Sequence, residues 1–164
     1  DALLAALAQS EPGDALADVA SDGSVPGLML AAAALEEEGK LEEAAAQLDL
    51  LAVNQDAPAI YRDVATLKSV MLRAETLTAD DKRTRLTQLT PPGNPLRLLA
   101  EEQLALIDIE TGDLDAAAAR LDMIEADAET SAGLRLRVGQ LKLALGLAPQ
   151  GLGDGAEAPA IEGE

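Results

Sequence analysis

The amino-acid sequence predicts an all-α fold in which antiparallel helix hairpins follow one another along the chain. Three observations lead to this prediction. Hydrophobic residues make up 48% of the 164 positions, yet Phe and Trp are absent and Tyr61 is the only aromatic residue. Ala and Leu carry the apolar fraction and favour helices, whereas the β-branched and aromatic residues typical of strands are sparse. Apolar residues also recur at helical spacing between Gly and Pro breaks, and one helix-turn motif occurs twice.

The first 25 residues are expected to form short helices that cap the array or make a partial repeat. Residues 1–9 are rich in Ala and Leu, and a second helix is expected at 14–20 with Asp14 as its N-cap. Pro12 and Gly13 separate these two helices, and a Ser-Asp-Gly-Ser turn follows them.

The next two helices are expected to form a hairpin. Pro26 suits the first turn of a helix that reaches residue 38, and Gly39 breaks it. A helix at 41–53 follows at once, so the two should pack antiparallel. The residues expected to face the core are Leu28, Ala31, Ala32 and Leu35 in the first helix and Ala44, Ala45, Leu48 and Leu51 in the second.

Five turn or capping signals divide the remaining sequence into helices. Pro58 opens one helix, Thr78 caps a shorter one that ends near residue 89, and Thr-Pro-Pro-Gly-Asn-Pro at 90–95 is the clearest loop. Helices at 96–111 and 114–127 flank Gly112, and Ser131 caps a last helix at 132–145. The helix that starts at Pro58 is expected to carry the apolar residues Ile60, Val64, Leu67, Val70, Met71 and Ala74.

The most informative feature is the repeated motif, which reads GKLEEAAAQLDLL in one copy and GDLDAAAARLDMI in the other. The Gly permits a tight turn between helices, and the first Leu is expected to plug the mouth of the hairpin. The small Ala suits the point where two helices cross, and the second Leu fills the space below. These structural positions are Gly39, Leu41, Ala44 and Leu48 in the first copy and Gly112, Leu114, Ala117 and Leu121 in the second.

The motif resembles the second half of the tetratricopeptide repeat consensus. This resemblance implies a right-handed superhelical array, or solenoid, with repeats at about 26–56, 58–90 and 95–129 and a capping helix at 132–145. The middle unit lacks the motif and is placed only by its position. Together these units form an expected domain at 26–147, and the Gly-, Pro- and Glu-rich segment 148–164 is expected to be a disordered acidic tail. In the consensus register, a concave protein-binding groove would be lined by Met29, Ala33, Glu36, Glu37, Glu102, Leu106, Ile109 and Glu110.

A more specific resemblance lies in IYRDVATLKSVML, PPGNPLRLLAEEQLALIDIETGDLDAAAARLDMI and SAGLRLRVGQL. In this order the segments are similar to the tetratricopeptide-like domain of the ancillary SecYEG translocon subunit family (the YfgM type), although Leu96 stands where an aromatic residue is expected. The resemblance implies a protein-binding domain on the periplasmic side of the inner membrane, tethered by an N-terminal anchor that this chain lacks. Its expected partners are translocon or chaperone components.

The amino-acid composition argues against several other classes of function. Without Cys or His there are no thiolate nucleophiles, disulfides or imidazole ligands, and no catalytic activity, cofactor or metal is expected. A net charge of -18 disfavours nucleic acid and anionic membrane surfaces, so no direct membrane contact is expected of this fragment. Two alternatives to the tethered module remain open: a self-assembling scaffold, with a homodimer that buries Leu106 and Ile109, and a soluble cytoplasmic tetratricopeptide adaptor.

Overall fold

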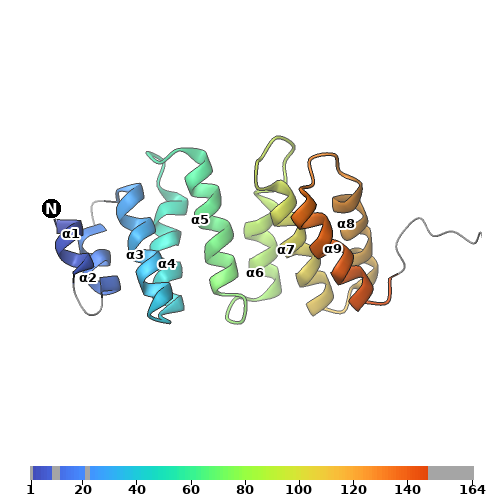
Figure 1. Cartoon of the computed structure of the whole chain (residues 1–164), viewed down its shortest axis with the longest axis horizontal. Helices are drawn as coiled ribbons and strands as arrows, with labels where there is room; N and C mark the ends of the chain where they lie inside the picture. Colours follow the sequence, from blue (N-terminus) through green and yellow to red (C-terminus); the bar gives the residue numbers. More distant parts are fainter. Residues whose placement is uncertain (1, 9–11, 21–22, 148–164) are drawn as a thin grey trace, which may run out of the picture.

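The computed structural model describes residues 2–8, 12–20 and 23–147, and all regular elements in these ranges are α-helices. Each helix packs mainly against its neighbours in sequence, so the helices form a row from α1 to α9 (Figure 1). The all-α prediction is therefore confirmed. The helices are α1 (Ala2–Leu7), α2 (Pro12–Val19), α3 (Val25–Glu37), α4 (Leu41–Val53), α5 (Ala59–Leu72), α6 (Ala79–Thr87), α7 (Arg97–Glu110), α8 (Leu114–Ala126) and α9 (Ala132–Ala144).

Most helix ends lie within a few residues of their predicted positions. Thr78 and Ser131 cap α6 and α9 by accepting hydrogen bonds from backbone N–H groups, as predicted. The prediction for Asp14 is wrong, because α2 begins at Pro12, whose fixed φ suits a first helical position. Asp14 lies in the first turn of α2, and its carboxylate accepts a hydrogen bond from Lys40 at 2.8 Å. The expected tail at 148–164 lies outside the described residues.

Glycines with positive φ end α3 and α7. Gly39 has a φ of 76° and Gly112 a φ of 80°, a region that residues with a Cβ rarely adopt. The N–H after each glycine bonds back to a carbonyl five residues earlier, from Lys40 to Leu35 and from Asp113 to Asp108, at 2.8 Å in both cases. These Schellman turns leave only a few residues between α3 and α4 and between α7 and α8.

Within the described residues, the core consists of three clusters along the row. The first draws on α1 to α5, the second on α5 to α7 and the third on α7 to α9. Helices α5 and α7 each serve two clusters: Ala65 and Leu67 of α5 face different clusters, as do Leu104 and Ala105 of α7. The stripes predicted for α3 and α4 are buried in full. The row is thus continuous, with each shared helix joining one cluster to the next.

The stripe predicted for α5 is only partly correct. Leu67 and Val70 are buried, but Ile60 is 40% and Met71 50% exposed, and Ala74 lies beyond the helix end and is exposed. Because α5 contacts α4 on one side and α6 on the other, its buried positions do not follow a single stripe.

Ion pairs connect the helices across the row. All twelve basic residues lie in the described part of the chain, and ten of them form ion pairs there. Asp49 of α4 accepts hydrogen bonds from Ser69 of α5 at 2.6 Å and from Arg85 of α6 at 2.9 Å, and it also pairs with Arg73. One carboxylate therefore holds three helices in register.

Candidate binding groove

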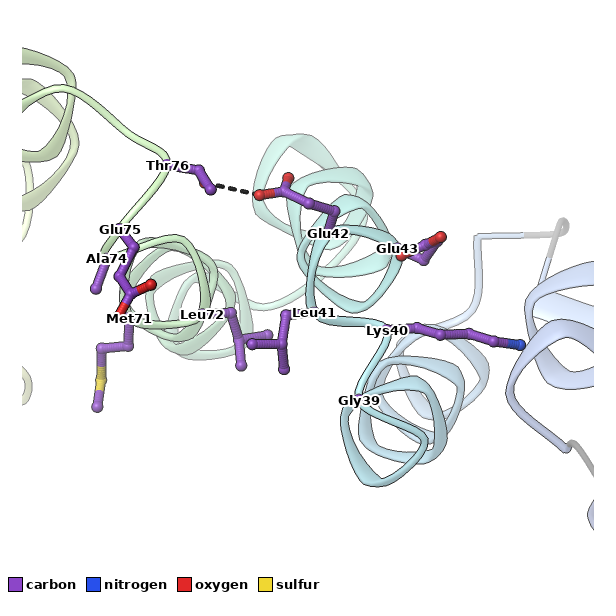
Figure 2. A pocket seen from close by; sticks show the side chains of 10 residues that line it. All are labelled: Gly39, Lys40, Leu41, Glu42, Glu43, Met71, Leu72, Ala74, Glu75 and Thr76. Atoms are coloured by element: carbon purple, nitrogen blue, oxygen red, sulfur yellow. Dashed lines mark hydrogen bonds between the residues drawn. The ribbon is translucent and has the colours of Figure 1, made fainter.

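A groove of about 610 Å³ opens where the turn between α3 and α4 meets the connection between α5 and α6 (Figure 2). The pairing of α4 with α5 creates it, because the contacts of Arg73 with Glu42 and of Ser69 with Asp49 set the two helices antiparallel. The end of α5 thereby returns to the start of α4. The groove is lined by residues 39–43 and by Met71, Leu72, Ala74, Glu75 and Thr76.

The groove has an apolar surface that water reaches. Leu41 at the start of α4 is 44% exposed, and Met71 near the end of α5 is 50% exposed. Leu72 packs partly against the first core cluster, and its side chain and that of Leu41 point toward one another (Figure 2). A partner could therefore bury Leu41 and Met71 without displacing the core.

Glu42 forms a polar wall that is fixed in place. The Thr76 hydroxyl donates to its carboxylate at 2.7 Å (Figure 2), and Arg73 donates to the other oxygen at 2.8 Å. These hydrogen bonds, first from Thr76 and then from Arg73, lower the pKa of Glu42 below its usual value. They also tie the α5–α6 connection to α4, which holds the two sides of the groove together.

The charge that remains in the groove is negative. The Lys40 amine lies 2.8 Å from Asp14 and 2.9 Å from Glu38, and its side chain points toward α2, away from the groove (Figure 2). Hydrogen bonds to Asp14 and then Glu38 raise the pKa of Lys40 above its usual range. Glu43 on the α4 side and Glu75 on the α5 side are exposed, and neither has an ion-pair partner among the described residues (Figure 2).

The residues predicted to line a concave groove lie elsewhere, on α3 and α7, which α4, α5 and α6 separate in the row (Figure 1). On α3, Met29 is partly buried against the first core cluster, while Ala33, Glu36 and Glu37 are exposed. The Glu36 carboxylate lies 3.2 Å from Lys68 of α5. One acidic side chain of the predicted α3 surface, Glu36, is thus already paired with Lys68 of the same chain.

On α7, the placement of Glu102 in an exposed groove is wrong. Its residue surface is 6% exposed, and its two oxygens accept hydrogen bonds from Arg137 of α9 at 2.7 and 2.8 Å. Leu106 is 38% exposed and Ile109 is partly buried. Glu110 is exposed and pairs with Lys82 of α6 at 2.6 Å.

The repeated motif splits into buried and exposed positions. The small and second apolar positions are buried in both copies: Ala44, Leu48, Ala117 and Leu121 are at most 1% exposed. The expectation that Leu41 and Leu114 plug hairpin mouths is wrong, since they are 44% and 47% exposed. Both are the first residues of their helices, at the edge of the row.

Sequence reasoning missed the groove because half of it comes from the unit without the motif. Met71, Glu75 and Thr76 follow no repeat pattern, and their proximity to Leu41 depends on how α4 and α5 pair. One local signal was present. Met71 and Leu72 are adjacent apolar residues at a helix end, and side chains one residue apart on a helix point in different directions.

The described part of the chain holds no group of three metal-binding side chains, and none of its helices has the length and apolar character needed to cross a bilayer. Comparison of the chain with models of protein families, with curated proteins and with solved structures finds no match. Its function must therefore be inferred from its own residues and their arrangement.

Proposed function

We propose that this chain is a non-catalytic protein-binding module, a tetratricopeptide-like solenoid with right-handed superhelical twist that holds a segment of a partner protein. The observation that carries this proposal is the groove between the α3–α4 turn and the α5–α6 connection, which is lined by the exposed Leu41 and Met71 and by acidic groups. Its volume of about 610 Å³ suits a few side chains of a bound polypeptide.

The frame around the groove supports binding without rearrangement. Glu42 is bonded to Thr76 and Arg73, and the neighbouring Asp49 joins α4, α5 and α6. A surface that is already ordered loses less conformational entropy when a partner binds. The tetratricopeptide assignment rests on the repeated motif, whose Ala44, Leu48, Ala117 and Leu121 pack inside the array.

We further propose that the module acts on the periplasmic side of the inner membrane, tethered there, and that its partners are components of the Sec translocon or periplasmic chaperones. The support for this is the resemblance of three sequence segments within residues 60–141 to the ancillary translocon subunit family. The net charge of -18 agrees with protein rather than nucleic acid as the ligand.

Capture of partners by matched variants tests the protein-binding proposal. Leu41→Glu with Met71→Glu charges the groove, and Leu106→Glu with Ile109→Glu charges the face predicted from the repeat register. Leu50→Glu with Val53→Glu is the control, because these α4 residues are 56% and 69% exposed and lie outside the groove. We expect the wild-type chain to retain translocon or chaperone proteins from a detergent-solubilised membrane extract.

The groove variant alone should lose this binding, while circular dichroism shows that all three variants remain folded. Equal binding by the wild type and the groove variant would contradict the proposed site. Loss only in the Leu106 and Ile109 variant would instead place the binding face on α7.

Self-assembly is a second candidate that α9 favours. Leu136 and Leu143 are 64% and 76% exposed, and they lie on the side of α9 that faces away from the buried Leu134 and Val138. Sedimentation equilibrium distinguishes this candidate. A concentration-dependent dimer that Leu136→Glu with Leu143→Glu abolishes would support a scaffold, and a monomer at all concentrations would exclude it.

A further inference from the structure

We infer that the groove beside Leu41 and Met71 takes a cationic amphipathic segment of a partner polypeptide: an apolar side chain seats against Leu41, Met71 and Leu72, and flanking Lys or Arg residues pair with Glu43 and Glu75. This inference rests on the proposed protein-binding function and adds the chemistry of the segment that is bound.

The apolar surface of the groove is open to a side chain of a partner. Leu41 and Met71 come from different helices and are about half exposed, while Leu72 packs partly against the first core cluster. Burying an apolar side chain here removes partner and groove surface from water together, which favours binding. A wholly polar ligand would not gain the free energy of burying this apolar surface.

Around this surface, the charged side chains without an ion-pair partner among the described residues are acidic. The cations nearest the groove are already engaged: Lys40 with Asp14 and Glu38, and Arg73 with Glu42 and Asp49. Glu43 and Glu75 have no such partner in the described part of the chain; Glu43 belongs to α4 and Glu75 to the α5–α6 connection, and both line the groove (Figure 2). A bound cation would therefore meet carboxylates on either side of the apolar surface.

The balance of charge over the whole chain also favours a cationic segment. Ten of the twelve basic side chains are used in ion pairs within the described part of the chain, and over the full sequence 30 acids against 12 bases leave a net charge of -18. Such a field attracts cationic segments and speeds their encounter, most strongly at low ionic strength. Acidic segments and nucleic acids are repelled by the same field.

The test uses short fluorescein-labelled peptides and fluorescence anisotropy. One peptide alternates Leu with Lys, a second alternates Leu with Glu, and a third alternates Ser with Lys. Two double variants are compared with the wild type. Glu43→Gln with Glu75→Gln alters the groove, and Asp56→Asn with Asp115→Asn removes the same charge from exposed positions without ion-pair partners in the described residues. All four positions are exposed, so the variants should fold.

We expect the Leu–Lys peptide to bind the wild type and the other two peptides to bind at least tenfold more weakly. The groove variant should bind the Leu–Lys peptide roughly fivefold more weakly, since two solvent-exposed pairs are lost, and the Asp variant should bind it nearly as tightly as the wild type. An equal loss in both variants would show non-specific attraction and overturn the inference, as would equal binding of the Leu–Lys and Leu–Glu peptides.

Two further outcomes would also overturn it. One is self-association that the groove variant abolishes, because the occupant would then be a second copy, through its basic helix α9. The other is loss of partner capture in the Leu41→Glu, Met71→Glu variant without any binding of the Leu–Lys peptide. In that case the protein-binding function would stand while the proposed chemistry of its ligand would be wrong.

Discussion

At the scale of single residues, backbone conformation at two glycines decides where hairpins turn. Gly39 and Gly112 have positive φ, and a Cβ added at either position would meet no atom within 4 Å. Glycine is therefore required at these two positions by the backbone conformation and not by a lack of space for a side chain. An L-residue in this region is disfavoured by about 1–2 kcal/mol.

Gly39→Ala should therefore lower the free energy of unfolding by about 1–2 kcal/mol. Gly139→Ala is the matched control, because Gly139 lies inside α9 with equally open space around its Cα. There alanine should raise stability by about 0.5–1 kcal/mol. Urea unfolding of both variants checks the prediction, and changes of the same sign would contradict it.

Asp49 is the residue on which the α4–α5–α6 junction depends most. Burial alone would raise its pKa, but hydrogen bonds from Ser69 and Arg73 and the charges of Arg85 and Arg73 outweigh burial and lower the pKa below its usual value. A carboxylate with a lowered folded-state pKa stabilises the fold above its unfolded value of about 3.9, and this contribution is lost as pH falls through the folded value.

Asp49→Asn should cost about 1–2 kcal/mol near pH 7, because charged hydrogen bonds become neutral ones. The variant should also lose less stability than the wild type between about pH 5 and pH 2, since one of the carboxylates that protonate in this window is gone. Urea unfolding across this range checks both statements. An unchanged slope of stability against pH would show that Asp49 is not coupled to folding.

At the scale of helices, α9 closes the C-terminal end of the array. Its Leu134 and Val138 pack with Leu121 and Ile124 of α8. Lys142 is 3% exposed and lies 2.7 Å from Asp122 and 2.6 Å from Glu125, both on α8. A terminal helix of this kind covers apolar surface that a repeat array otherwise leaves open.

A chain that ends at residue 131 should therefore unfold at lower temperature and less cooperatively than one that ends at residue 147. Leu121 and Ile124, which are 0% exposed in the intact array, would face water in the shorter chain. Differential scanning calorimetry of the two chains measures this. An equally sharp transition at the same temperature would show that α9 does not act as a cap.

Prediction from sequence succeeded where a local pattern controls the outcome. Helix α4 has its predicted bounds, and its four-residue stripe is buried, because spacing and a flanking glycine determine both. Prediction from sequence failed where the burial of a side chain depends on which helices pack together. Nothing in the pattern around Glu102 indicates that Arg137, 35 residues later, would pair with it and remove it from the surface.

At the scale of the whole molecule, basic and acidic side chains have different roles. Basic side chains form ion pairs that join helices, and the excess of acidic residues makes the net charge negative. The groove at the α3–α4 turn is where exposed apolar groups meet that acidic surface. For this reason we propose the groove as the contact point for a partner, and its position away from the α3 and α7 faces distinguishes it from the groove that the repeat register predicts.

Site-specific photo-crosslinking tests this central claim most directly. A photoreactive benzophenone amino acid replaces Met71 in the groove or, as a control, Val53, which is 69% exposed outside it. Both proteins are irradiated in membrane extract with and without excess Leu–Lys peptide. We predict a covalent adduct with translocon or chaperone polypeptides from position 71 only, suppressed by the peptide. Adducts of equal yield from both positions, or none from position 71, would contradict the groove as the binding site.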